Sequence, residues 1–176
     1  INKIIVLAPQ AGVTYQWAKE VKKILGLHME KINSPDDLYA TIIHPQIEVK
    51  TSDSRAVLKH QVALKKMVTQ MGNFGGLISG LYTNDFDLIG RSLHDEVIEP
   101  NRLVLIPEFD KVKKGVIQAG ALGAGISGSG PSIFALSKGE ETAKLVGKTM
   151  AEIYNNTDID YDIHVSKINQ QGIKIL

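Results

Sequence analysis

The chain has 176 residues, enough for one domain with a hydrophobic core or slightly more. Apolar residues make up 43% and charged residues 22%, and the net charge of +1 points to neither a nucleic-acid nor a membrane-surface partner. The absence of cysteine excludes disulfides, zinc–thiolate sites and iron–sulfur clusters, and it fits a reducing compartment. No apolar run is long enough to span a bilayer, so we expect a cytoplasmic protein.

The first 32 residues form a segment that we leave without an assigned function. An apolar run at residues 4–7 predicts a strand, and residues 15–25 predict a helix with one apolar face. A strand, a glycine turn and a helix can bind a nucleotide, but Gly12 stands alone and no dinucleotide-binding or Walker pattern surrounds it. The chain begins at Ile1 rather than methionine, which suggests a piece of a longer protein, or a processed or trimmed one.

Strand and helix patterns alternate through the rest of the chain. Alternating or short apolar runs predict strands at residues 38–43, 133–136, 161–168 and 172–176. Apolar residues at helical spacing predict helices at residues 51–58, 61–81, 87–97, 108–118 and 139–154. Three glycines at residues 72–76 are expected to weaken or kink the second of these helices. The order is typical of an α+β protein, a ferredoxin-like antiparallel sheet with helices on one face.

Residues 125–136, with the sequence GISGSGPSIFAL, are the most distinctive stretch. Glycine permits a positive φ and a close approach to the main chain, and consecutive N–H groups in such a turn can form an anion-binding nest. Pro131 then directs the chain out of the turn in an extended conformation. Taken alone, the stretch also fits a tight turn between two strands, with the glycines present for steric reasons only.

Two arginines lie in polar segments. Arg55 is one helical turn from Thr51, and Arg102 follows Pro100 in a turn-like stretch. A guanidinium is a fork of donors that matches carboxylate or phosphate oxygens, so two converging arginines would clamp an amino-acid carboxylate. Taken singly, each arginine is better explained as a solvated surface residue. The five histidines share no ligand spacing and are interpreted as surface or structural residues, so we expect no metal site.

The glycine-rich stretch resembles the third signature motif of the GHMP kinase superfamily, and in particular that of homoserine kinases. Two further segments, residues 44–58 and 95–107, lie in the same order and at similar spacing in homoserine kinases. The resemblance runs from about Ser34 to Leu176. It implies that residues 33–176 form a GHMP kinase C-terminal domain of ferredoxin-like fold, on the substrate side of the enzyme.

The resemblance also implies roles for individual residues. In homoserine kinases the matching arginines hold the substrate, the matching threonine lies near the transferred phosphate, and the glycine motif lines the same cleft. We therefore expect substrate binding by Arg55, Arg102 and Gly128. We expect a place near the phosphate for Thr51, Ser127, Ser129 and Gly130.

Parts of the family's catalytic machinery are missing from the sequence. Phosphoryl transfer needs a phosphate cradle and usually Mg²⁺. The family's cradle, a proline followed by glycines and two serines that lead into a helix, does not occur in this chain. The asparagine and aspartate that contact homoserine early in the family's sequences are also absent. We expect the catalytic residues in an absent N-terminal half, no tight binding of ATP or Mg²⁺, and no kinase activity of this chain alone.

The parent reaction implied by the resemblance is transfer of the γ-phosphate of ATP to the hydroxyl of L-homoserine in threonine biosynthesis. One alternative is another GHMP kinase with a different small alcohol as substrate, although a neutral substrate would not need the arginine pair. A second alternative is a ferredoxin-like regulatory domain that binds an amino acid without chemistry. A missing half would expose a sheet edge or face, which favours a homodimer.

Overall fold

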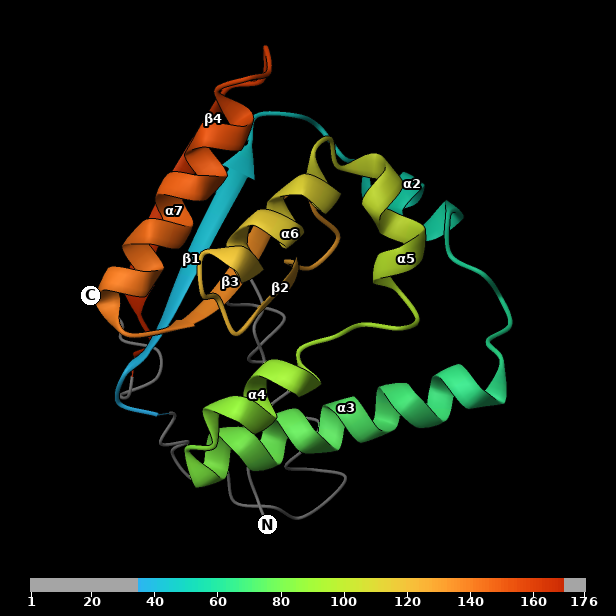
Figure 1. The fold of residues 1–176 in the computed structure, drawn as a ribbon. Coiled ribbons are helices and arrows are strands. Elements are labelled where there is room, and N and C mark those ends of the chain that lie inside the picture. Colours follow the sequence, from blue (N-terminus) through green and yellow to red (C-terminus); the bar gives the residue numbers. More distant parts are fainter. Residues whose placement is uncertain (1–34, 170–176) are drawn as a thin grey trace, which may run out of the picture.

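The computed structural model describes residues 35–169 (Figure 1). The strands predicted at residues 4–7 and 172–176 and the helix predicted at residues 15–25 lie outside these residues. The described part contains one four-stranded sheet and the helices that surround it.

The sheet consists of β1 (Leu38–Pro45), β2 (Gly123–Ile126), β3 (Ile133–Lys138) and β4 (Tyr161–Lys167). Its strand order is β2-β3-β1-β4, and every neighbouring pair is antiparallel. With one helix crossover before β2 and another before β4, this is the ferredoxin-like β-α-β-β-α-β arrangement. The α+β prediction with an antiparallel sheet is therefore confirmed.

The helices α6 (Phe109–Gln118) and α7 (Glu140–Tyr154) cover one face of the sheet (Figure 1). The odd-numbered residues of β1 point toward α7, since the Thr41 hydroxyl donates to the Ala143 carbonyl oxygen at 3.0 Å. The main core forms between these helices and the sheet from buried apolar side chains, among them Ile43, Phe109, Val112, Ile133, Val146, Met150 and Tyr154.

A second pair of helices packs on part of the opposite face. They are α3 (Leu64–Thr83) and α4 (Phe86–Ser92), and they share a smaller apolar cluster with the sheet through Leu38, Leu81, Ile89 and Leu136. Helix α3 is continuous, so the predicted interruption at residues 72–76 is wrong. One of these glycines serves packing instead, because a Cβ at Gly76 would lie 2.4 Å from the Ser92 hydroxyl oxygen. Packing on α4 outweighs the low helix propensity of glycine.

The helix predicted at residues 87–97 is also wrong in its second half, because α4 ends at Ser92. The Asp95 carboxylate accepts hydrogen bonds from the N–H groups of Val97 and Ile98, both at 2.8 Å. Hydrogen bonds from an aspartate side chain to nearby main-chain N–H groups compete with the hydrogen bonds of a helix. The next residues form two short helices, α5 (Glu99–Arg102) and the 3-10 helix η1 (Leu103–Leu105), where we expected only a turn.

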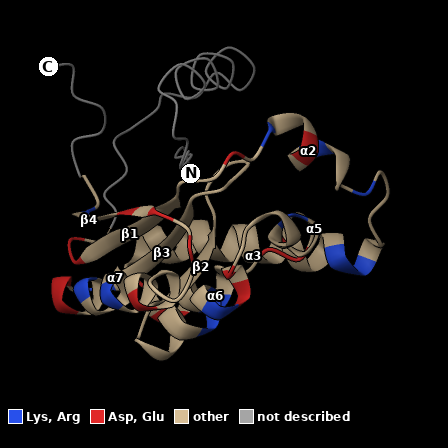
Figure 2. Ribbon diagram, turned by 90° about the horizontal axis from the view of Figure 1, so that it is seen from above, with Lys and Arg blue, Asp and Glu red and all other residues tan. Residues whose placement is uncertain are grey.

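The remaining helix, α2 (Thr51–Ala56), is shorter than predicted, and its N-cap is Lys50. The elements α2 to α5 all lie between β1 and α6, so they form one insertion in the first crossover of the fold. Acidic and basic residues are interspersed along α7, whereas the N-terminal end of α3 is basic (Figure 2). The same end of α3 exposes large apolar side chains, namely Leu64, Met67, Val68, Met71 and Phe74. Within residues 35–169, no helix has the length and apolar character to cross a membrane.

Candidate functional site

The connection between β2 and β3 is the glycine-rich loop, residues 127–132. Gly128 has a φ of 63° and Gly130 a φ of 86°, the left-handed region that glycine adopts without strain. The loop is closed by two hydrogen bonds, from the Ser127 N–H to the Ser132 carbonyl at 2.8 Å and from the Gly130 N–H to the Ser127 carbonyl at 3.1 Å. The N–H groups of Gly128 and Ser129 take no part in these two bonds.

Arg102 joins this loop to α2. Its Nη1 donates to the Gly128 carbonyl oxygen at 2.9 Å, and its Nε donates to the Ser54 carbonyl oxygen at 3.2 Å. The Ser54 hydroxyl in turn donates to the Ser129 carbonyl oxygen at 2.9 Å. Three segments that are far apart in the sequence, α2, α5 and the glycine-rich loop, therefore meet at one place.

The far end of the loop is tied to β1. His44 lies near the end of that strand, and its Nδ1 is 2.8 Å from the Ser132 hydroxyl oxygen. The hydrogen bond fixes the point at which the loop re-enters the sheet. A structural role for this histidine agrees with its interpretation from the sequence.

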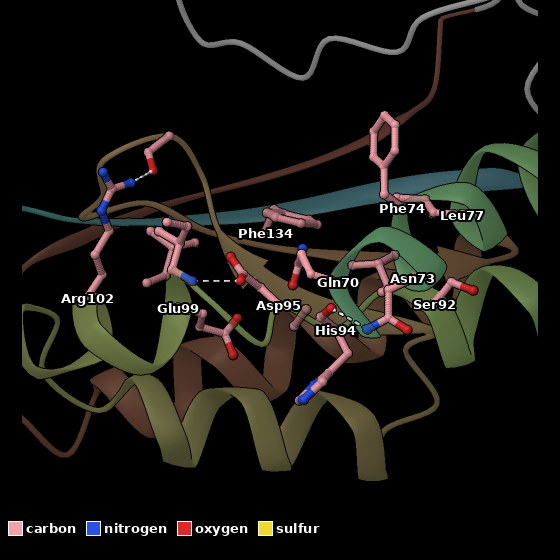
Figure 3. A pocket seen from close by; sticks show the side chains of 16 residues that line it. Gln70, Asn73, Phe74, Leu77, Ser92, His94, Asp95, Glu99, Arg102 and Phe134 are labelled. Carbon is pink, nitrogen blue, oxygen red and sulfur yellow. Dashed lines mark hydrogen bonds between the residues drawn. The ribbon is translucent and has the colours of Figure 1, made fainter. Parts of the chain in front are cut away.

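An open pocket of about 210 Å³ lies beside the loop (Figure 3). Arg102 lies at one end of it, Phe74 and Leu77 lie at the other, and Asp95 and Glu99 lie between them. Further lining comes from Gln70, Asn73, Ser92, Leu93, His94, Ile98, Ala124, Gly125, Ile126, Gly128 and Phe134. The wall is thus apolar at Phe74 and Leu77 and charged at Asp95, Glu99 and Arg102.

Amide side chains of α3 hold the segment that carries these charges. The Gln70 side-chain oxygen accepts a hydrogen bond from the Glu96 N–H at 2.7 Å. The Asn73 side chain donates to the His94 carbonyl oxygen at 2.9 Å (Figure 3). The loop between α4 and α5 is thereby fixed to α3 on one side of the pocket.

Glu99 is a buried carboxylate in the pocket wall, 8% exposed. It forms an ion pair with Lys113 of α6. It also lies against β2, since a Cβ at Gly125 would be 3.4 Å from the Glu99 Oε2. Burial raises the pKa of Glu99 above its ordinary value, and the hydrogen bond and charge of Lys113 partly oppose that shift. The pair anchors α5, and Arg102 follows Glu99 by three residues, about one helical turn.

The structure brings together some of the residues that we singled out from the sequence. Arg102 and Gly128 line the pocket and contact each other. The others are placed around them: Thr51 and Arg55 are exposed on α2, and Ser127, Ser129 and Gly130 belong to the loop without lining the pocket. The functional role of each of these residues stays a prediction.

Several polar residues of the pocket were not predicted, among them two acidic residues and two amides. Asp95 and Glu99 lie in a segment that carried the family resemblance, but no role was assigned to them. Gln70 and Asn73 lie on α3 three residues apart, and this polar pair inside an apolar helix is the signal that could have identified them. Among residues 35–169, no group of three or more acidic or histidine side chains is placed to hold a metal ion.

Comparison with known proteins relates this chain to a family of kinases. The family model described as "GHMP kinases C terminal" matches residues 77–156. A homoserine kinase of Chlorobium phaeobacteroides (strain BS1) is 48% identical over 147 residues, which cover 82% of this chain and 46% of the relative. A homoserine kinase of Thermococcus kodakarensis is 36% identical over 133 residues, covering 76% of this chain and 44% of the relative.

Solved structures agree with these relatives. The homoserine kinase of Cytophaga hutchinsonii is 52% identical, with a TM-score of 0.80 over 86% of this chain and 48% of the other. A phosphomevalonate kinase of Streptococcus pneumoniae, 14% identical with a TM-score of 0.62, shares the fold. The chain spans about half the length of the curated relatives that it matches. Residues 77–156 thus match the C-terminal domain of the GHMP kinases, and most of the chain is similar to about half the length of homoserine kinases.

Proposed function

We propose that residues 33–176 are the substrate-side domain of a homoserine kinase. The whole enzyme transfers the γ-phosphate of ATP to the hydroxyl of L-homoserine, a step of threonine biosynthesis in the cytoplasm. The observation that carries the proposal is that Arg102 meets the glycine-rich loop in a pocket of about 210 Å³. This volume is below the roughly 300–1,000 Å³ of sites for drug-sized ligands, which suits a small amino acid.

The guanidinium of Arg102 supports an anionic group at its end of the pocket. Hydrogen bonds to main-chain carbonyls use two of its five N–H groups, which leaves three for a substrate carboxylate. In our proposal Arg55 supplies the second guanidinium for this carboxylate. The N–H groups of Gly128 and Ser129 provide further donors for an anion.

Residues of α2 and of the loop are proposed to lie on the phosphate side of the substrate. They are Thr51, Ser127, Ser129 and Gly130. The hydroxyls of Thr51, Ser127 and Ser129 are donors of the kind that stabilise the charge on a transferred phosphoryl group. Gly130 instead shapes the loop, since its N–H already donates to the Ser127 carbonyl oxygen. ATP and Mg²⁺ supply this group and neutralise its charge when they are bound. We propose that the part of the relatives that this chain does not span holds both.

The relatives support neither of the two alternatives raised by the sequence. They are homoserine kinases, and each is similar to this chain over most of its length. A kinase for a neutral alcohol has no use for a guanidinium at the end of its pocket. A purely regulatory domain would bind homoserine and threonine through the same contacts, so the two ligands need to be compared directly.

Calorimetry with L-homoserine tests the proposal. We expect binding to the wild-type chain, a loss of affinity of about tenfold or more in Arg55→Ala and Arg102→Ala, and no loss in Arg91→Ala. Arg91 is an exposed arginine of α4 outside the pocket lining and serves as the matched control. Binding of the carboxylate-free analogue 2-amino-1,4-butanediol as tight as that of homoserine would contradict the proposal. So would threonine binding at equal affinity, which would favour a regulatory domain.

A kinase assay completes the test. With ATP and Mg²⁺ we expect no phosphorylation of homoserine by this chain alone, because the family's phosphate loop is absent from its sequence. Measurable turnover by the 176-residue chain would overturn the expectation that catalysis needs another part of the enzyme.

A further inference from the structure

Helix α2 is attached to the rest of the domain through one of its residues. Five of its six residues are exposed, whereas Ser54 is completely buried. The helix has no side-chain hydrogen bond at its N-cap, and the residues on either side of it form neither helix nor strand as far as residues 46–50 and 57–63. Because a six-residue helix is not stable by itself, its place depends on the contacts of Ser54.

Those contacts close a ring of hydrogen bonds. The Ser54 hydroxyl donates to the Ser129 carbonyl oxygen, and the Ser54 carbonyl oxygen accepts from the Arg102 Nε. The Arg102 Nη1 then donates to the Gly128 carbonyl oxygen, one residue before Ser129. Ser54 thus connects α2 both to the glycine-rich loop and to the arginine that lines the pocket.

We propose that Ser54 is a positioning residue of the substrate site. It touches no substrate, and it acts by holding Arg55, the next residue of α2, in a fixed relation to Arg102 and the loop. The inference rests on the proposed function, which assigns Arg55 to the substrate carboxylate. Two guanidinium groups bind one small carboxylate well only if their separation is fixed in advance.

We expect the domain to stay folded when the hydroxyl of Ser54 is removed. Ser54→Ala deletes the bond to the Ser129 carbonyl but keeps the main-chain carbonyl that accepts from Arg102. Helix α2 contributes no residue to either apolar cluster of the described domain. The matched control is Ser52→Ala, since Ser52 is an exposed hydroxyl of the same helix and bonds only to the neighbouring Asp53.

Hydrogen exchange of the ligand-free chain tests the anchoring. In Ser54→Ala we expect exchange about fivefold faster in peptides covering residues 51–58 and 127–130, because one hydrogen bond holds both segments. We expect no change in peptides of β1 and β3, and no change anywhere in Ser52→Ala. Equal exchange in the two variants would overturn the proposal. An equal rise throughout the sheet would also overturn it, because it would show that Ser54 has a general structural role.

A double-mutant cycle on homoserine affinity tests the route of action. We expect Ser54→Ala alone to weaken binding about fivefold or more, and to weaken it less than twofold when Arg55 is already alanine. Independent, multiplicative losses would overturn the proposal, because Ser54 would then act on binding without Arg55. If the wild-type chain binds no homoserine, the proposed function fails for this chain, while the exchange experiment still decides whether Ser54 anchors α2.

Discussion

The guanidinium of Arg102 donates to the carbonyl oxygen of Gly128 at 2.9 Å, across 26 positions of sequence. The same side chain reaches Ser54, which is 48 positions away. A fork of rigid donors can serve two carbonyls and still present free N–H groups to a pocket. This arginine is therefore part of the architecture of the site as well as a candidate ligand for the substrate.

Replacement of Arg102 by lysine separates charge from geometry. An ammonium group keeps the charge but cannot reproduce the fork that reaches both Ser54 and Gly128. We expect Arg102→Lys to lower the free energy of unfolding by about 1.5–3 kcal/mol, the range for hydrogen bonds to charged groups, and to weaken homoserine binding. Urea unfolding and calorimetry measure the two effects. An unchanged variant would show that the charge alone matters.

The buried Glu99 predicts a dependence of stability on pH. Its pKa is raised in the folded state, mainly by burial, so the folded protein holds this proton more tightly than the unfolded chain does. Its contribution to stability is fully present below the unfolded pKa, near 4.5, and is lost as the pH rises through the raised pKa. We expect Glu99→Gln to remove this loss of stability. Urea unfolding at a series of pH values measures the effect.

The control for this experiment is Glu152→Gln, an exposed glutamate of α7. Its pH profile of unfolding should follow that of the wild-type chain. If Glu99→Gln and Glu152→Gln gave the same profile, the raised pKa of Glu99 would be refuted.

Lys113 is expected to matter more to stability than the lysine beside it. Lys113→Met leaves the buried Glu99 carboxylate without its partner, which costs about 3–5 kcal/mol at neutral pH. Lys114→Met is the matched control, because Lys114 is exposed on the same helix. We expect thermal unfolding to show a large decrease for the first variant and little change for the second. Equal effects of the two substitutions would mean that the ion pair between Glu99 and Lys113 contributes nothing specific to stability.

Tyr154 predicts a loss of stability at alkaline pH. Its hydroxyl donates to the Pro107 carbonyl oxygen at 2.7 Å, and burial, followed by the charge of Glu108, raises the pKa of Tyr154 to about 12. The folded state keeps the proton, so stability falls between the ordinary value of 10 and about pH 12, by about 2–3 kcal/mol in total. Tyr154→Phe should not show this fall but should cost about 1 kcal/mol at neutral pH.

Tyr39→Phe serves as the control for the alkaline experiment, since Tyr39 lies on β1 and is only partly buried. Its unfolding between pH 10 and 12 should match that of the wild-type chain. A Tyr154→Phe variant that still lost stability in this range would place the responsible group elsewhere.

The glycines of α3 should respond to substitution with opposite signs. A Cβ at Gly72 or Gly75 would meet no atom within 4 Å, so alanine there should stabilise the protein by about 0.5–1 kcal/mol through helix propensity. A Cβ at Gly80 would lie 2.9 Å from the main-chain nitrogen of Ile89, so Gly80→Ala should destabilise it by about 1–3 kcal/mol. Thermal unfolding measures all three. A stabilised Gly80→Ala variant would contradict the close packing of α3 on α4.

Local patterns in the sequence were sufficient for much of the fold. The apolar alternation of β4 and the single apolar face of α7 have periods that only one kind of element satisfies. β2 escaped prediction because its four residues, two of them glycine, have neither alternation nor a high strand propensity. The predicted interruption of α3 and the predicted helix beyond Ser92 were wrong, because packing on α4 and the Asp95 carboxylate decide those segments.

The sequence by itself determined the resemblance to homoserine kinases and the α+β class, and it predicted a list of site residues that includes Arg102 and Gly128. Only the tertiary structure decided that Arg102 lies in the pocket wall while Arg55 stays exposed on a helix held by Ser54. The reason is the range of the contacts involved: the hydroxyl of Ser54 finds its acceptor 75 positions further along the chain. Local periodicity reports which face of an element is buried, but it carries no information on the element against which that face is packed.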